Sequence, residues 1–346
     1  MLPEEQIEEI KKHLKNAINP LFFFDNDADG LCSYLLLSRY VGGAKGVAIK
    51  SFPKLSKGYA RKLYELKPDY VFILDKPNVE KGFIEEAKKL SLPIVWIDHH
   101  KVEQEIPEGV DYYNPIMPGE GIKKTGEPVS YWCHKIVNQD LWVAMTGCIG
   151  DHYIPNFSEE FGKEYPELWN NPDKASEALY ETGIGKLARI FEFALKDRTS
   201  KVVRMIKKLQ KVNSPHEILK PGKNNKILER FNEINHKFEN FIDKAKKEAS
   251  DDKILFFQYG GGLSLSGDIA NKLSYLYPHK IIVVAYIKGS YANISVRGDK
   301  IREIILEALD ELDDASGGGH ENAVGCRVRV KDLDKFKKKI EELSGK

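Results

Sequence analysis

Short apolar runs alternate with helix-like stretches over roughly the first 155 residues. The intervening stretches, such as GLCSYLLLSRYV and FIEEAKKL, place their apolar residues at helical spacing. Continuous apolar strands that alternate with helices predict a parallel sheet covered on both faces. Four runs are typical of buried strands: PLFFFD (20–25), GVAIKSF (46–52), YVFILD (70–75) and PIVWID (93–98).

The pattern changes twice further along the chain. Long, charged, helix-favouring sequence extends from about 157 to 250, and strand patterns return with KILFFQY, KIIVVAYI, YANISVRG and CRVRV. We therefore expect an α/β protein with three parts: a parallel-sheet domain (1–190), a helical connector (191–252) and a smaller α/β domain (253–346).

Composition narrows the choice of partners. The longest apolar runs are far shorter than the roughly 20 residues that cross a bilayer, so no membrane partner is expected. The four cysteines include no CxxC pair, which fits a reducing cytoplasm. With 53 basic and 52 acidic residues, the net charge is only +1. A protein that coats long nucleic acid is usually strongly basic, so any nucleic-acid contact here should be local.

Acidic residues follow three of the predicted strands. Asp25, Asp75 and Asp98 end these runs, and His99 and His100 come directly after Asp98. The carboxyl ends of parallel strands lie along one edge of a sheet, so these side chains should converge. Several ionised carboxylates share a crevice only when a cation offsets their repulsion. Carboxylates with imidazoles and without thiolates suit manganese or magnesium.

Single strand-terminal aspartates have a more ordinary role, because they commonly cap the helix that follows. Asp25 or Asp75 alone would be read in that way. The spacing Asp27-Ala-Asp29 is different, since alternate residues of an extended segment point in the same direction. We therefore expect both of these carboxylates to reach one site.

Four segments in this order resemble the successive motifs of the DHH phosphoesterase family: DNDADGLCS (25–33), the strand end at Asp75, IDHH (97–100) and AMTGCIGD (144–151). The segment SGGGHENAVG (316–325) resembles the glycine-rich signature of the DHH-associated domain. The family includes RecJ-type exonucleases, nanoRNases, cyclic-dinucleotide phosphodiesterases and family II pyrophosphatases. Some relatives carry histidine where this chain has Asn26, which argues against a pyrophosphatase.

The resemblance implies two divalent ions, manganese first and magnesium as the alternative, and hydrolysis of a phosphodiester by in-line attack of an activated water. Asp98, His99 and His100 would be the catalytic residues. Asp98, and also Asp25, would support the ligands from outside the coordination sphere. The implied metal ligands are Asp27, Asp29, Asp75, His99, His100 and Asp151.

The resemblance also implies that residues 1–190 form the catalytic domain, that residues 253–346 form a substrate-binding domain, and that the active site lies in the cleft between them. In the C-terminal part it implies recognition of phosphate and of a nucleotide end. Glycines let backbone N–H groups approach an anion, and the arginine fork donates two bonds at once. From the residues alone, a flexible turn is an equal alternative for the glycine run. The implied substrate-binding residues are Arg297, Gly317, Gly318, Gly319 and His320.

These observations favour a manganese-dependent exonuclease or oligonucleotide phosphodiesterase acting on single-stranded RNA or DNA, with short oligonucleotides expected because of the low net charge. One alternative is a phosphodiesterase for cyclic dinucleotides or their linear products. Another is a scaffold of the same fold that binds replication or repair proteins. The choice between RNA and DNA, the direction of digestion and the oligomeric state do not follow from the sequence.

Overall fold

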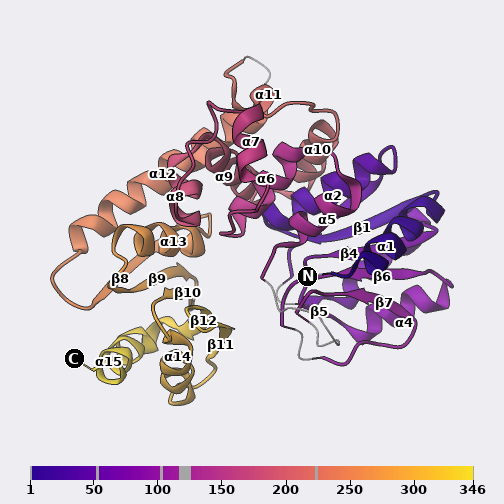
Figure 1. The fold of residues 1–346 in the computed structure, drawn as a ribbon. Coiled ribbons are helices and arrows are strands. Elements are labelled where there is room, and N and C mark those ends of the chain that lie inside the picture. The colour runs from indigo at the N-terminus through magenta and orange to yellow at the C-terminus, as the bar shows by residue number, and fades with distance from the viewer. Residues whose placement is uncertain (1, 52–53, 102–103, 117–125, 223–224, 346) are drawn as a thin grey trace. The chain divides into compact units, whose positions relative to one another are not determined.

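The structure is a computed structural model that describes residues 2–51, 54–101, 104–116, 126–222 and 225–345. The chain divides into two compact units, Met1–Phe231 and Asn232–Lys346 (Figure 1). Across the described residues, every helix is too short or too polar to span a bilayer. The three-part division at 190 and 252 stays a prediction.

The first unit is built on a five-stranded sheet in the order β2-β1-β4-β6-β7, in which every neighbouring pair is parallel. This confirms the parallel sheet that the apolar runs predict, and adds the edge strand β7, which the pattern did not indicate. The strands are β1 (Pro20–Asp25), β2 (Lys45–Ile49), β4 (Tyr70–Leu74), β6 (Ile94–Ile97) and β7 (Val110–Tyr113).

Helices cover both faces of this sheet (Figure 1). Leu21 and Phe23 of β1 belong to a buried cluster with η1 (Lys57–Ala60), α3 (Arg61–Leu66) and α4 (Lys81–Lys89). The alternate residues of the same strand, Phe22 and Phe24, pack on Tyr34 of α2 (Ala28–Tyr40), with ring centroids 5.8 and 4.8 Å apart. Because successive side chains point to opposite faces, an apolar run without interruption is what a strand buried on both sides requires. A small parallel pair, β3 (Lys54–Leu55) and β5 (Asn78–Val79), lies beside this cluster.

The other helices of the first unit extend α2 into a helical layer. α2 packs against α5, α6 and α9. A side chain at Gly150, the last residue of α6, would come within 2.5 Å of the Ala28 Cβ, so glycine lets the end of α6 approach the start of α2. These helices are α1 (Glu4–Asn16), α5 (Val129–Val137), α6 (Leu141–Gly150), α7 (Ser158–Glu164), α8 (Ala175–Glu181), α9 (Gly183–Leu195), α10 (Thr199–Leu209), α11 (His216–Leu219) and α12 (Lys226–Glu248), which continues into the second unit.

The second unit has a five-stranded sheet in the order β11-β12-β10-β9-β8. β8 and β9 are parallel, and the other pairs are antiparallel. The glycine run forms the edge strand β11, so the alternative of a flexible turn is wrong for these residues. The elements are β8 (Ile254–Gly260), α13 (Ser266–Leu276), β9 (Ile281–Lys288), β10 (Tyr291–Arg297), α14 (Ile301–Asp310), β11 (Ser316–His320), β12 (Ala323–Arg329), η2 (Val330–Asp332) and α15 (Leu333–Leu343).

The two faces of this second sheet are covered differently. On one face, residues such as Ile294 and Val328 form the core with α14 and α15. On the other face, α13 packs against β9 and β10, and its Ser266 lies 3.0 Å from Ser295. Gly325 of β12 has open space where a side chain would project. This half of the second face, over β12 and β11, is therefore uncovered within the described part of the unit.

Candidate metal centre

The predicted acidic edge exists in the first unit. Asp25 is the last residue of β1, and Asp75 and Asp98 directly follow β4 and β6. Each of the latter two still joins the sheet through its backbone: Asp75 N–H donates to Ile97 at 2.9 Å, and Asp98 N–H donates to Tyr113 at 3.0 Å. Parallel strands thus deliver these carboxylates to one edge, as the strand pattern predicts.

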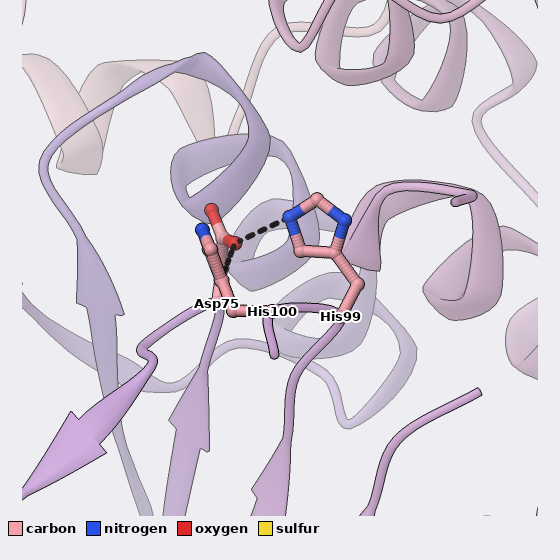
Figure 2. A group of neighbouring side chains, drawn as sticks. All are labelled: Asp75, His99 and His100. Carbon is pink, nitrogen blue, oxygen red and sulfur yellow. Dashed lines mark ion pairs between the residues drawn. The ribbon is translucent and has the colours of Figure 1, made fainter. Parts of the chain in front are cut away.

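Asp75 contacts both histidines of the IDHH segment, as the dashed lines of Figure 2 show. Its Oδ1 is 3.3 Å from His99 Nε2 and 3.7 Å from His100 Nδ1. The side chain is 2% exposed, and the backbone adopts a positive φ of 57°. Aspartate tolerates this left-handed conformation better than most residues do. Asp75, His99 and His100 offer one ligand atom each within 4.8 Å of one another.

His99 also belongs to a second group of three. Its Nε2 lies 3.7 Å from Asp151 Oδ2, and Asp29 completes the set within 4.8 Å. Asp151 is the C-cap residue directly after α6, so the close approach of α6 to α2 places it beside Asp29. The two groups share His99 and therefore adjoin each other. Among the described residues, these groups contain five of the six predicted ligands, and Asp27 is the one left out.

A buried oxygen shows that this arrangement fits a cation. Among the described residues, Asp75 Oδ1 is buried and has no hydrogen-bond donor. An unsatisfied buried acceptor is costly, and a carboxylate costs more than a neutral group. Two atoms about 2.1 Å from an octahedral ion lie about 3 Å apart when they are adjacent. The separations of 3.3 and 3.7 Å around Asp75 and His99 are close to that spacing.

In the described part of the chain, Asp98 bonds only one of the two histidines that it was predicted to support. His100 donates from Nδ1 to Asp98 Oδ1 at 2.8 Å, and its backbone N–H donates to Oδ2 at 3.2 Å. Asn114 then holds the His100 carbonyl through a 2.8 Å hydrogen bond. Since Nδ1 is engaged by Asp98, a metal or substrate atom would have to use Nε2 of this ring.

The two aspartates of the DxD spacing do not lie on an extended segment. Asp27 is the N-cap of α2 and accepts a hydrogen bond from Gly30 N–H at 2.8 Å. Asp29 lies in the first turn and accepts from the N–H groups of Val129 and Ser130 at 2.8 and 2.9 Å. The geometric reason given for this pair is therefore wrong, although Asp29 does reach the cluster. Two such bonds leave a carboxylate with lone pairs for a cation.

Asp25 has a partner that the motifs do not reveal. The fully buried Lys76, next to Asp75 in the chain, lies with its Nζ 2.8 Å from Asp25 Oδ1. Trp96 fixes the same backbone by donating to the Lys76 carbonyl at 2.9 Å. Lys76 therefore brings a positive charge to the base of the acidic edge. A lysine after an acidic strand end has no distinctive spacing, so no sequence pattern indicates this role.

Glu192 of α9 is a further carboxylate beside the first motif. Its Oε1 accepts the Ala28 N–H at 2.7 Å. Its charge also contributes to raising the pKa of both Asp27 and Asp151. Because 164 positions separate it from Ala28 along the chain, only the packing of α9 on α2 brings it there.

Burial and the crowding of carboxylates shift the pKa values of several groups in this site away from their ordinary values. Burial, followed by the charges of Asp75 and Asp25, raises the pKa of Asp27 well above its ordinary value. Burial and Asp29 do the same to the pKa of Asp75. Burial raises the pKa of Asp151 to about 7, with His99 opposing the change. Burial opposes charging of His100, but the hydrogen bond and charge of Asp98 outweigh it and raise the pKa of His100 to about 10.

We expect Mn²⁺ binding at pH 7 to release protons, because burial raises the pKa of Asp151 to about 7, so this carboxyl is partly protonated and the cation must displace its proton. Affinity should rise between pH 6 and pH 8 as the fraction of protonated Asp151 falls. In the metal-free protein the same carboxyl binds its proton more tightly when folded than when unfolded. Its contribution to stability is therefore lost as the pH rises from about 4 to 7. Calorimetry in buffers of different ionisation enthalpy measures the release, and a buffer-independent heat would contradict it.

The Asp98–His100 contact gives a second prediction. In Asp98→Asn, loss of the carboxylate charge should lower the pKa of His100 from about 10 toward the ordinary histidine value. Metal affinity or activity should fall by about 10- to 100-fold, the usual effect of removing a carboxylate that orients a ligand. An NMR titration of the His100 ring and a hydrolysis assay with Mn²⁺ measure the two effects. Asp111→Asn, at a half-exposed aspartate of β7, is the matched control, and equal effects of both variants would refute the role of Asp98.

In the second unit, the predicted substrate-binding residues lie on neighbouring strands. Arg297 of β10 and His320 of β11 are both in register with Ala323 of β12, so their side chains project from the same face. Arg297 Nε donates to Asn271 Oδ1 at 2.6 Å. Gly318 has open space around it, whereas a side chain at Gly317 would meet Leu309 at 2.6 Å. Gly319 adopts a φ of +147°, so part of the glycine run serves packing and backbone geometry.

Two family models match the chain, one in each of its two units. The N-terminal domain of the DHH family matches residues 21–146, and the DHHA1 domain matches residues 253–346. No curated protein sequence matches the chain.

Several solved structures share the fold. RecJ from Thermus thermophilus in complex with Mn²⁺ is 17% identical, with a TM-score of 0.70 over 99% of this chain and 55% of that one. The chain thus spans about half the length of that protein. An exonuclease RecJ bound to manganese is 15% identical, with a TM-score of 0.67 over 100% and 96% of the two chains. CDC45 from Entamoeba histolytica is 10% identical, with a TM-score of 0.52 over 98% of both. With the two domain matches and the acidic edge, these likenesses lead to one conclusion: the chain is a DHH-family protein with a DHHA1 domain in its C-terminal part.

Proposed function

We propose that the protein is a manganese-dependent phosphodiester hydrolase that degrades single-stranded nucleic acid or short oligonucleotides from an end. The observation that carries this proposal is the buried Asp75 Oδ1, which has no hydrogen-bond donor among the described residues and faces both His99 and His100. A carboxylate–imidazole set of this kind suits manganese, with magnesium as the alternative. The two RecJ structures of the same fold hold manganese, which supports the choice.

The residues have separable tasks in this proposal. Asp75, His99, Asp29 and Asp151 would hold two divalent cations, with ionised Asp27 as a further ligand. Divalent cations bound there would lower the pKa of water and offset charge on a phosphoryl oxygen. Asp98 holds the imidazole of His100 by its Nδ1 and keeps it protonated, so its Nε2 can donate to a phosphoryl oxygen or, after deprotonation, bind a cation.

The second unit would bind the substrate. Arg297 is suited to a terminal phosphate because its planar guanidinium carries a fixed positive charge and several N–H donors. The N–H groups beside Gly318 could approach an anion, since no side chain of the described residues blocks that position. His320 projects from the same face as Arg297 and can add one hydrogen bond. The expected cytoplasmic location and the expected replication or repair partners stay predictions.

The test uses the full chain with Mn²⁺ and a dinucleotide, a pentamer and a 30-mer, each as RNA and as DNA and each labelled at either end. His99→Ala, which removes the ring shared by both groups, is the inactive control. Stepwise loss of the 30-mer in the wild type alone would support an exonuclease, and the label lost first gives its direction.

Two other outcomes favour the alternatives. Cleavage of only the shortest substrates would indicate a nanoRNase-like enzyme or a phosphodiesterase for cyclic or linear dinucleotides. Absence of all cleavage, while calorimetry shows bound Mn²⁺, would refute the nuclease. The replication-associated scaffold would then be the better description of this fold.

A further inference from the structure

The uncovered half of the second sheet carries a group of polar residues well away from Arg297 and His320. Register places Arg327 of β12 opposite Asn293 of β10, and Tyr291 lies two residues before Asn293 on the same strand. All three side chains project from the face that carries Arg297, because residues two apart share a face. Arg327 is exposed.

The Arg327 guanidinium lies over an aromatic ring and is not neutralised by a carboxylate. Its Cζ lies 3.7 Å from the centroid of the Tyr291 ring. The Tyr291 hydroxyl donates to Asp314 Oδ2 at 2.5 Å, which fixes the ring. Asp314 also accepts two hydrogen bonds from Arg329, and Arg329 therefore neutralises the charge of Asp314. No carboxylate lies within salt-bridge distance of Arg327 in the part of the chain that the structure describes.

Two glycines lie between the group of Arg327, Tyr291 and Asn293 and the predicted phosphate-binding residues. Gly325 of β12 and Gly318 of β11 are paired in the row between them, and a side chain at either position would meet no atom of the described residues within 4 Å. Arg327 is four residues from Ala323, the row of Arg297 and His320, which corresponds to about 13 Å along a strand. Phosphates of a B-form strand are about 3.4 Å apart along the axis, so this distance exceeds one nucleotide step.

We propose that Arg327, Tyr291 and Asn293 form a second nucleotide subsite, in which a base of a single-stranded substrate stacks on the outer face of the Arg327 guanidinium. Bases commonly stack on arginine planes in single-strand recognition. The Asn293 carboxamide lies in the same row and can bond the edge of that base. The inference rests on the proposed function and deepens it: the substrate is an oligonucleotide longer than a dinucleotide, with its end at Arg297 and an inner nucleotide at Arg327.

Binding without cleavage tests this subsite. Fluorescence anisotropy in EDTA would compare a labelled dinucleotide with 12-mers of RNA and DNA. The full chain would be used as wild type, Arg327→Ala, Arg327→Lys and Lys338→Ala. Lys338 is exposed on α15, which packs on the opposite face of the sheet, so its removal controls for net charge.

We expect Arg327→Ala to weaken 12-mer binding about tenfold, the low end of what one stacked base contributes, and to change dinucleotide binding less than twofold. Arg327→Lys keeps the positive charge but removes the planar guanidinium on which the base stacks. It should therefore retain less than half of the affinity that Arg327→Ala loses. Lys338→Ala should leave both affinities within twofold of the wild type. Unchanged 12-mer binding, or an equal loss for both lengths, would overturn the subsite. A wild type that binds the 12-mer in this way and cleaves nothing with Mn²⁺ would refute the proposed hydrolase alone.

Discussion

Asp75→Asn should abolish Mn²⁺-dependent hydrolysis, with a loss of activity of at least about 1,000-fold. It should also weaken Mn²⁺ binding by more than roughly 100-fold, which is the upper end of the effect of residues that only orient a ligand. Asp75 Oδ1 lies within contact distance of both motif histidines, at 3.3 and 3.7 Å. Asparagine keeps the shape and the tolerance for a positive φ, but it removes the charge.

Asp75→Asn should, by contrast, stabilise the folded protein when no metal is bound. Burial and the neighbouring carboxylates raise the pKa of Asp75, so ionising it costs free energy in the folded state. A neutral amide avoids that cost above the ordinary aspartate pKa. Asp75→Asn should therefore melt at a higher temperature than the wild type in EDTA at pH 8, and saturating Mn²⁺ should reverse the order.

Calorimetry with Mn²⁺, oligonucleotide hydrolysis and thermal melts with and without EDTA measure these effects. Asp243→Asn, at an exposed aspartate of α12, is the control and should match the wild type in all three. Manganese affinity within tenfold of the wild type in Asp75→Asn would show that this carboxylate is not a ligand. A lower melting temperature in EDTA would instead point to a purely structural role.

The acidic edge was predictable because it depends on one general property of parallel sheets. Apolar runs without interruption identify strands buried on both faces, and the residue after each run must then lie at the carboxyl edge. Asp75, Asp98 and His99 are positioned in this way, so their convergence needs no knowledge of the helices. The two groups that share His99 follow from that edge and from the end of α6.

Other features depend on packing between distant segments and could not be predicted. Asp29 is held by the start of α5, 100 residues later, and Glu192 reaches Ala28 from α9. The side chains of the DxD spacing follow helical rather than extended geometry, since α2 begins at Ala28. The glycine run resembles a loop in composition but is an edge strand, because its pairing with β12 is a property of the folded sheet.

The largest effect on stability should come from Lys76→Met. The Lys76 side chain is fully buried and pairs with Asp25, which is itself 17% exposed, beneath the acidic edge. Removing one member of a buried pair leaves the other charge uncompensated, at a cost of several kcal/mol. Because Asp25 keeps some access to water, we expect a loss of about 3 kcal/mol, the low end of that range. Lys81→Met, at an exposed lysine of α4, should change stability by less than about 0.5 kcal/mol.

A double variant distinguishes loss of the Lys76–Asp25 ion pair from loss of the packing of the lysine side chain. If the destabilisation comes from the uncompensated Asp25 carboxylate, Asp25→Asn combined with Lys76→Met should recover part of the loss, since the two residues form one coupled unit. Urea unfolding in metal-free buffer measures the free energy of unfolding of all variants. Mn²⁺ titration of folded Lys76→Met shows whether the metal site still binds its ion. Strict additivity of the two substitutions would show that Lys76 stabilises the fold by packing alone. Recovery would show that this part of the fold is stabilised by the pairing of Lys76 with Asp25 and not by the packing of the lysine side chain alone.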